Sequence, residues 1–421
     1  MPSREEATSL LSQQGAPRSG HIKAAPAHGE PGSAVSAFLG LATTMMGAVI
    51  LTLPGTVQAV GVVPALVLFA VGAWMAYVSF EMLCVSCDAV DAWSYEALSS
   101  RLFGAAGVWA VRVFTLALLF GAIVMYMVIA MDLFEPFVAH YVSRSTVGLV
   151  FVALAVPLCL PETIHELRYA NLLVLVCLVY ILIVLIIRCA QDDPEFVAQI
   201  QPNPEDTFSS ELAALAYAAP IITLSYACQL NVPRAYQEIH DKAAIKHVHQ
   251  ALAVFAFVCY VGFALVGYYC FHGQPPSDIL TGFAADDTLV NTARLALGAS
   301  MVLKTPMTFQ PLRQLVELCF LGHDRESLPF RTVITVVFMV AAHLLSVSSD
   351  SLGVIMAFIG AIAGNILTAT VPGMILYEVT TEYMMVPHAF YSQRLALVFA
   401  YAGVAFSIIS LTYLSYNALA G

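Results

Sequence analysis

Long apolar stretches recur from one end of this 421-residue chain to the other, and they leave few folds open. A helix needs about 20 predominantly apolar residues to cross a bilayer. Eleven candidate spans can be placed, at residues 34–59, 62–86, 107–134, 146–160, 168–189, 211–231, 248–271, 288–312, 331–348, 351–378 and 394–417. We therefore expect an all-α polytopic membrane protein with about eleven transmembrane helices.

The composition supports lipid as the solvent. Apolar residues make up 60% of the chain and charged residues only 11%, whereas soluble domains carry about 25% charged residues. The net charge of −11 comes with no basic tract that could bind nucleic acid. The sequence offers no nucleophile–base pattern, metal-ligand cluster or ring of charges at membrane depth, so we expect neither an enzyme, a bound metal or cofactor, nor a channel.

The lysines and arginines predict the orientation of the chain. If the N-terminus is cytosolic, thirteen of the 17 fall on the inner side and three, Arg144, Arg188 and Arg294, on the outer side. This bias is the one that sets membrane topology. The remaining one, Lys304, falls inside a predicted span. The basic stretch 234–249 is then cytosolic, and we expect its histidines, His240, His247 and His249, to be solvated.

The polar N-terminal segment 1–31 is predicted to be a disordered cytosolic tail before a single transporter domain at 32–421. Glu6, Leu10 and Leu11 resemble an acidic dileucine sorting signal, which would bind a sorting adaptor and direct the protein to a lysosome or vacuole. Two incidental leucines in a tail are the alternative.

Two predicted spans carry helix-breaking residues at matching places. The first contains ATTMMGAVILTLPG (42–55) and the sixth contains AAPIITLSYACQLNVPRAY (218–236). Broken helices five spans apart are typical of an inverted repeat, with the substrate bound near the breaks. We therefore predict repeats at 34–189 and 211–378 and an extra helix at 394–417. The alternative is that these residues only ease helix packing.

The segment SYACQLNVPRAYQEI (225–239) resembles the sixth-helix signature of the amino acid/auxin permease family, nearest to its sodium-coupled neutral amino acid transporters and their vacuolar and protist relatives. MMGAVILTLPG (45–55) is similar to the family's first break, although Ala48 and Val49 stand where Ser and Gly are usual. VPGMILY (371–377) resembles the tenth helix. This resemblance implies a LeuT-like fold with five-plus-five helices and secondary active amino acid transport by alternating access.

The resemblance also implies a substrate site. The backbone of the first break would bind the amino and carboxylate groups, residues of the sixth break would complete the pocket, and an aromatic side chain of the third span would gate it. The residues of the first break are Gly47, Ala48 and Val49, and those of the sixth break are Ser225, Tyr226 and Cys228. The gating aromatic residue is Tyr126.

Lys304 is the unusual residue of the expected ion site. A charge at the centre of a membrane helix costs roughly 2.5–3.5 kcal/mol on insertion scales. In sodium-coupled members, the positions matching Lys304 and Thr43 help to hold the ion, so the ammonium would replace sodium. A one-residue shift would instead place Thr305 at the site, with Thr308 a further candidate. A third alternative is that Lys304 extends to the cytosolic interface.

Three functions stay open at this point. The first is a proton-coupled or sodium-independent amino acid transporter of a lysosomal or vacuolar membrane. The second is a sodium-coupled importer of neutral amino acids at the plasma membrane. The third is an amino acid sensor with little flux. H⁺ or Na⁺ is the expected coupling ion, and the residues specify neither the amino acid nor the direction of flux.

Overall fold

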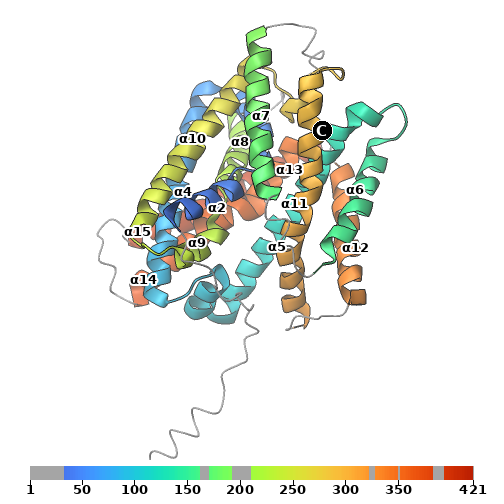
Figure 1. The fold of residues 1–421 in the computed structure, drawn as a ribbon. Helices are drawn as coiled ribbons and strands as arrows, with labels where there is room; N and C mark the ends of the chain where they lie inside the picture. The colour runs from blue at the N-terminus through green and yellow to red at the C-terminus, as the bar shows by residue number, and fades with distance from the viewer. Residues whose placement is uncertain are drawn as a thin grey trace, which may run out of the picture.

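The structure, a computed structural model, describes residues 33–161, 170–191, 210–321, 328–348, 351–382 and 393–420. Its named elements are helices, as the ribbon in Figure 1 shows. The expected disordered tail, with Glu6, Leu10 and Leu11, lies outside the described residues.

The helices follow the predicted apolar stretches. The first part of the chain forms α2 (Ala34–Met45), η1 (Ala48–Thr52), α3 (Leu53–Val60), α4 (Val62–Val90), α5 (Tyr95–Val138), α6 (Arg144–Cys159) and α7 (Ala170–Gln191). The second part forms α8 (Glu211–Ser225), η4 (Gln229–Asn231), α9 (Val232–Glu238), α10 (Ala244–Cys270), η5 (Ile279–Gly282), α11 (Thr288–Leu321), α12 (Leu328–Val347), α13 (Leu352–Ile359), η6 (Gly360–Gly364), η7 (Ile366–Thr370), α14 (Val371–Glu382) and α15 (Gln393–Ala420).

Nine membrane spans meet the requirements of length and composition within the described residues. Eight are continuous apolar helical segments, two of which, Glu211–Glu238 and Leu352–Glu382, contain the irregular stretches described below, and the ninth is the bent pair made by α2 with the segment Ala48–Val60. The fourth predicted span, α6, is apolar but has only 16 residues. The eighth, α11, is interrupted by polar side chains such as Lys304 and is not among these spans. The number of eleven spans therefore stays a prediction.

The first span is broken where the sequence predicts it. The helix α2 ends at Met45, and Gly47 continues in an extended conformation with φ −111° and ψ −176°. The 3₁₀-helix η1 then leads into α3, where Pro54 occupies the first turn. Proline is tolerated there because the first helical N–H groups have no intrahelical partner. The two halves are bent by 48°.

The sixth span repeats this plan. Its first half, α8, ends at Ser225, and Cys228 has the non-helical angles φ −136° and ψ 12°. The short 3₁₀-helix η4 leads into α9, which again has a proline, Pro233, in its first turn. Both broken spans therefore restart at a proline, and each break frees backbone groups in the interior of the molecule.

A third irregular span was not predicted. Between α13 and α14, residues Gly360–Gly364 and Ile366–Thr370 form π-helical turns. Such turns are rare and are frequent at functional sites. No proline interrupts this segment, so it lacks the signal that marks the other two breaks.

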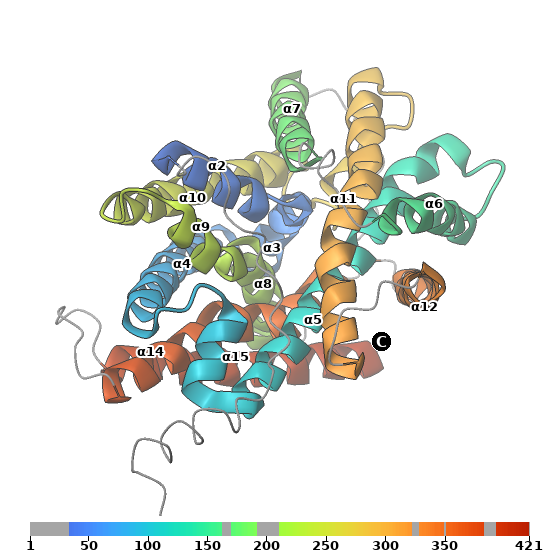
Figure 2. The ribbon, with the colours of Figure 1, turned by 60° about the horizontal axis from the view of Figure 1, so that its bottom comes forward.

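The remaining helices enclose these irregular spans. In Figures 1 and 2, α4 and α10 lie side by side at one edge of the bundle, and α6 and α12 lie together at the opposite edge. The long helices α5 and α11 pack against each other between these edges. The arrangement places the first and sixth breaks and the π-helical segment around one interior space.

The prediction that His249 is solvated is wrong. The helix α10 begins at Ala244, so His249 is already in its second turn. It shares a helical face with Ile245, Val248 and Leu252, and all four side chains are buried. This face packs against α4, where His249 Nδ1 lies 2.7 Å from Glu81 Oε1. His240 and His247 are exposed, as expected.

Candidate substrate and ion site

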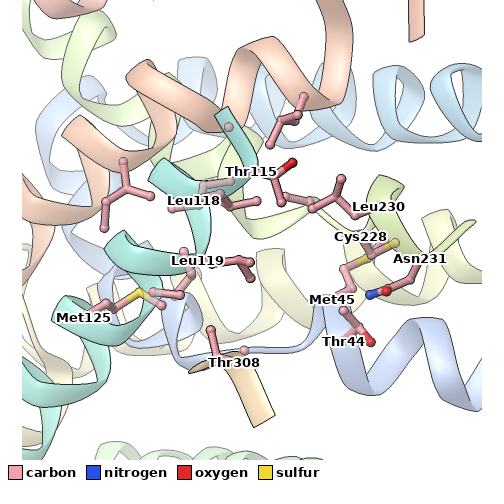
Figure 3. Close-up of a pocket in the computed structure, with 18 of the residues that line it drawn as sticks. Thr44, Met45, Thr115, Leu118, Leu119, Met125, Cys228, Leu230, Asn231 and Thr308 are labelled. Atoms are coloured by element: carbon pink, nitrogen blue, oxygen red, sulfur yellow. The ribbon is translucent and has the colours of Figure 1, made fainter. Parts of the chain in front are cut away.

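A cavity of about 450 Å³ lies between the two helix breaks. Thr44 and Met45 line it from α2, Leu118 and Leu119 from α5, and Cys228 from the sixth break, as Figure 3 shows. The π-helical segment and α11 complete the wall. Most of the lining is apolar, with a few polar groups, which is the usual composition of a small-molecule site.

Seven of the eleven predicted site residues line this cavity. They are Gly47, Ala48, Val49, Tyr126, Cys228, Lys304 and Thr308. The set joins four separate parts of the chain, namely the first break, α5, the sixth break and α11. The cavity therefore brings together residues that are up to about 260 positions apart in the sequence.

Ser225 and Tyr226 do not line the cavity, although they were expected to complete it. Both are 1% exposed. The Ser225 hydroxyl donates to the carbonyl of Ile222 at 2.6 Å, and the Tyr226 hydroxyl donates to the carbonyl of Phe69 at 3.1 Å. In this conformation both side chains support the sixth break from behind.

Thr43 and Thr305 also lie outside the cavity lining. Each hydroxyl donates to a carbonyl of its own helix, Thr43 to Leu39 and Thr305 to Met301, both at 2.8 Å. The structure therefore does not bring the two threonines of the alternative sodium site together at the cavity wall. Thr44, the neighbour of Thr43, lines the cavity instead.

Lys304 is buried, with 7% of its surface exposed. Its Nζ lies 5.5 Å from the centroid of the Tyr126 ring. A cation at this distance from an aromatic face is attracted by the ring quadrupole, by about 2 kcal/mol or more where water is excluded. Lys304 thus connects α11 to α5 at the cavity wall, with its ammonium beside this ring.

Several polar lining residues were not among the predicted site residues. Thr115, Gln229 and Thr368 line the cavity, and each has a buried side-chain oxygen without a hydrogen-bond partner in the described part of the chain. Buried polar atoms normally have partners, so these oxygens are candidates to contact a polar ligand or water. Gln229 and its polar neighbours could have been found from the sixth-break motif, but Thr115 and Thr368 carry no local signal.

Tyr260 of α10 connects the two helix breaks. Its hydroxyl lies 3.0 Å from the carbonyl oxygen of Met45 and 2.6 Å from that of Ser225. These carbonyls end α2 and α8, the first halves of the two broken spans. One buried hydroxyl therefore fixes the separation of the two breaks that border the cavity.

We expect the variant Tyr260→Phe to transport amino acid about tenfold more slowly, because it leaves the Ser225 carbonyl without its donor, at a cost of about 1–3 kcal/mol. The variant Tyr226→Phe is the matched control. The ring centroids of Tyr226 and Tyr260 are only 5.1 Å apart. The Tyr226 hydroxyl, however, donates to a single carbonyl of α4 and does not link the two breaks. Initial uptake rates, normalised to folded protein, would measure the difference. Equal rates for the two variants would contradict the linking role.

Two helices broken at mid-length around a cavity are typical of a secondary transporter with a LeuT-like fold. The "Inward facing conformation of Mhp1" superposes with a TM-score of 0.57 and 11% identity, over 92% of this chain and 91% of that one. This likeness confirms the predicted fold class. Residues 30–416 match the family described as "Transmembrane amino acid transporter protein", and the chain belongs to this family. The family and the fold are those of transporters and not of enzymes.

Curated relatives agree with this assignment. "Putative sodium-coupled neutral amino acid transporter 11" of Homo sapiens is 23% identical over 302 residues, which are 69% of this chain and 73% of the relative. "Amino acid transporter AVT6B" of Arabidopsis thaliana is 26% identical over 304 residues, 66% of each chain. The predicted family resemblance, nearest to the sodium-coupled neutral amino acid transporters, is confirmed.

Proposed function

We propose that the chain moves amino acids across a membrane by alternating access. This transport would be coupled to protons or would otherwise be independent of sodium. The observation that carries this proposal is the position of Lys304. It lines the cavity beside Tyr126, where the family resemblance predicts an ion-binding hydroxyl in sodium-coupled members. A fixed ammonium repels a sodium ion in a medium of low dielectric constant, and it supplies the positive charge that the ion would otherwise provide.

The two threonines of the alternative sodium site support the same reading. Thr43 and Thr305 do not line the cavity, and their hydroxyls are engaged with carbonyls of their own helices. Thr308 does line the cavity. We propose that its hydroxyl lies near the Lys304 ammonium and does not bind a metal ion.

The substrate would bind between the two breaks. We assign the backbone of Gly47, Ala48 and Val49 to the amino acid's carboxylate and amino groups, because a helix break at membrane depth exposes backbone hydrogen-bonding groups to a cavity. Cys228 would contact the bound molecule from the sixth break. Tyr126, whose ring lies beside the Lys304 ammonium, would act as the gate of the cavity. Closure of this gate would then depend on the positive charge of Lys304.

A sodium-coupled importer of neutral amino acids is the second candidate. The name of the human relative favours it, since it calls that protein a "putative sodium-coupled" transporter. The relation is distant, at 23% identity, and a coupling ion can change with a few ligand residues. The relative from Arabidopsis thaliana is described only as an amino acid transporter.

We further propose that the N-terminus is cytosolic and that the protein resides in a lysosomal or vacuolar membrane. The uneven distribution of Lys and Arg supports the orientation. The dileucine-like pattern at Glu6, Leu10 and Leu11 supports the location. The plasma membrane is the location that would fit the sodium-coupled candidate.

Uptake of radiolabelled amino acids into proteoliposomes tests the proposal. The purified protein would be given an imposed pH gradient in one experiment and an imposed sodium gradient in the other. We expect uptake that follows the pH gradient and is unchanged when potassium replaces sodium. A strict requirement for sodium would overturn the proposal in favour of the second candidate. Binding without uptake under either gradient would favour an amino acid sensor.

A further inference from the structure

A buried acid–base pair lies outside the cavity, between α4 and α10. Glu81 Oε1 and His249 Nδ1 are 2.7 Å apart. His249 is completely buried and Glu81 is 8% exposed. Neither residue lines the cavity. Ionisable residues within membrane domains are rare, costly and frequently part of a proton pathway, so this pair requires an explanation beyond helix packing.

The contacts of the histidine define where a proton can bind. Because an ionised carboxylate only accepts hydrogen bonds, we assign the hydrogen of this contact to Nδ1, which then donates to Glu81. The other ring nitrogen, Nε2, then presents a lone pair in the neutral imidazole. Nε2 is buried and has no hydrogen-bond partner among the residues that the structure describes. In this tautomer Nε2 can accept a proton beside a carboxylate.

Proton binding at Nε2 changes the net charge of the site. Before it binds, the site holds one carboxylate and one neutral imidazole. Afterwards it holds a carboxylate and an imidazolium, which neutralise each other at hydrogen-bond distance. A buried net charge costs more than a buried, hydrogen-bonded ion pair. Phe80 packs against the imidazole, with ring centroids 5.3 Å apart, and supplies apolar surroundings.

Other titratable groups lie near the contact between α4 and α10. They are Cys84, Cys87 and Asp88 from α4, Tyr236 from α9 and Lys242 from the loop before α10. Tyr236 donates to Asp88 at 2.6 Å, and Lys242 lies over the Tyr236 ring at 4.3 Å. On the neighbouring face of α4, α14 contributes Tyr377. Among the described residues, the His249 ring forms its hydrogen bond with Glu81 and with none of these groups.

The position of the pair links it to both helix breaks. The helix α10 packs against α2, η1 and α3 of the first broken span, and α4 packs against α8, η4 and α9 of the sixth. On α4, two residues before Glu81, Ser79 accepts a hydrogen bond from Gln229 at 3.2 Å. Gln229 lines the cavity. A movement of either break during transport therefore changes the α4–α10 seam that holds the pair.

We propose that Glu81 and His249 form the proton-binding site of the transporter, separate from the amino acid cavity and linked to it through α4 and α10. This inference rests on the proposed function, because it assigns the driving proton of that transport cycle to named atoms. The proton binds at His249 Nε2 from one side of the membrane and leaves to the other side after the breaks have moved. Glu81 neutralises its charge in between.

Two assays with the variants Glu81→Gln and His249→Gln test the proposal. The first is counterflow of a radiolabelled amino acid at equal pH on both sides, which needs no net proton movement. The second is accumulation driven by an imposed pH gradient, with pyranine inside the vesicles to record proton entry. We expect both variants to keep counterflow within about twofold of wild type and to lose accumulation and proton entry at least tenfold.

The variant His247→Gln is the matched control. It makes the same substitution two residues earlier, at an exposed position of α10, and should behave as wild type in both assays. The double variant Glu81→Met, His249→Leu removes both titratable side chains together, so that neither partner is left buried alone. We expect it to retain counterflow without proton entry even where a single variant folds poorly.

Three results would overturn the proposal. In the first, the variants accumulate amino acid as wild type does, so that the proton binds elsewhere. In the second, the two single variants of the pair and the double variant all lose both counterflow and thermal stability. The pair would then only hold α4 and α10 together. In the third, wild type shows counterflow but no accumulation under the pH gradient. Absence of counterflow in wild type for every amino acid tested would instead refute the proposed transport function itself.

Discussion

Replacing Lys304 with threonine is expected to lower sodium-free uptake at least tenfold and to make the remaining uptake respond to sodium. The side chain contributes a buried positive charge that lies 5.5 Å from the Tyr126 ring centroid at the cavity wall. Loss of about 2 kcal/mol of cation–π attraction alone corresponds to roughly 30-fold in an equilibrium constant. Initial uptake rates, measured with and without sodium at several pH values, would report both effects.

The control for this variant is Lys246→Thr, because Lys246 is exposed on the first turn of α10 and contributes nothing to the cavity. It should transport at the wild-type rate. The variant Lys304→Arg separates charge from shape, since the guanidinium keeps the positive charge but is larger and planar. If Lys304→Thr matches wild type in rate, pH response and sodium response, then Lys304 does not occupy the ion position.

The breaks in the first and sixth spans could be predicted because glycine and proline mark them locally. Gly47 and Pro54 in one span, and Pro233 in the other, stand at the positions where the helices stop and restart. The π-helical segment 360–370 could not be predicted in this way. It has no proline, and although it contains Gly360 and Gly364, glycines alone do not specify the wider turns of a π-helix.

The candidate site was predicted best where it consists of backbone and worst where it depends on side-chain direction. Gly47, Ala48 and Val49 line the cavity because the break itself lies there. Ser225 and Tyr226 belong to the other break, but their side chains turn away from the cavity to carbonyls behind it. A motif gives the position of a residue on a span, and the rotation of that residue about the helix axis depends on the whole bundle.

His249 shows a different cause of error. The basic and histidine-rich composition of residues 234–249 favoured a solvated loop, whereas the apolar spacing of Ile245, Val248 and Leu252 predicts a buried helical face that includes position 249. Periodicity was the better signal here, because a helix buries one face whatever the average polarity of the segment. The same reasoning identifies the histidine that faces Glu81.

Substituting alanine at Gly360 is expected to destabilise the protein, because a Cβ atom there would lie 2.4 Å from the carbonyl oxygen of Pro220 and 2.7 Å from its carbonyl carbon. Both are backbone atoms of α8, so the side chain cannot be accommodated by a rotamer change, and η6 must move away from the sixth span. Overpacking of this kind costs about 1–3 kcal/mol or more, which exceeds the roughly 1 kcal/mol that alanine gains over glycine in helix propensity.

Gly262→Ala provides the comparison, because a Cβ atom at Gly262 of α10 has nothing within 4 Å. It should unfold at the wild-type temperature or slightly above it, while Gly360→Ala should unfold several degrees lower. A thiol-reactive dye can follow unfolding in detergent, since Cys87, Cys159 and Cys228 are free and buried. Because α8 ends at the cavity, Gly360→Ala should also lose transport at temperatures where it is still folded. A melting temperature at or above that of Gly262→Ala would mean that α8 and η6 are not packed as closely in the membrane as these distances require.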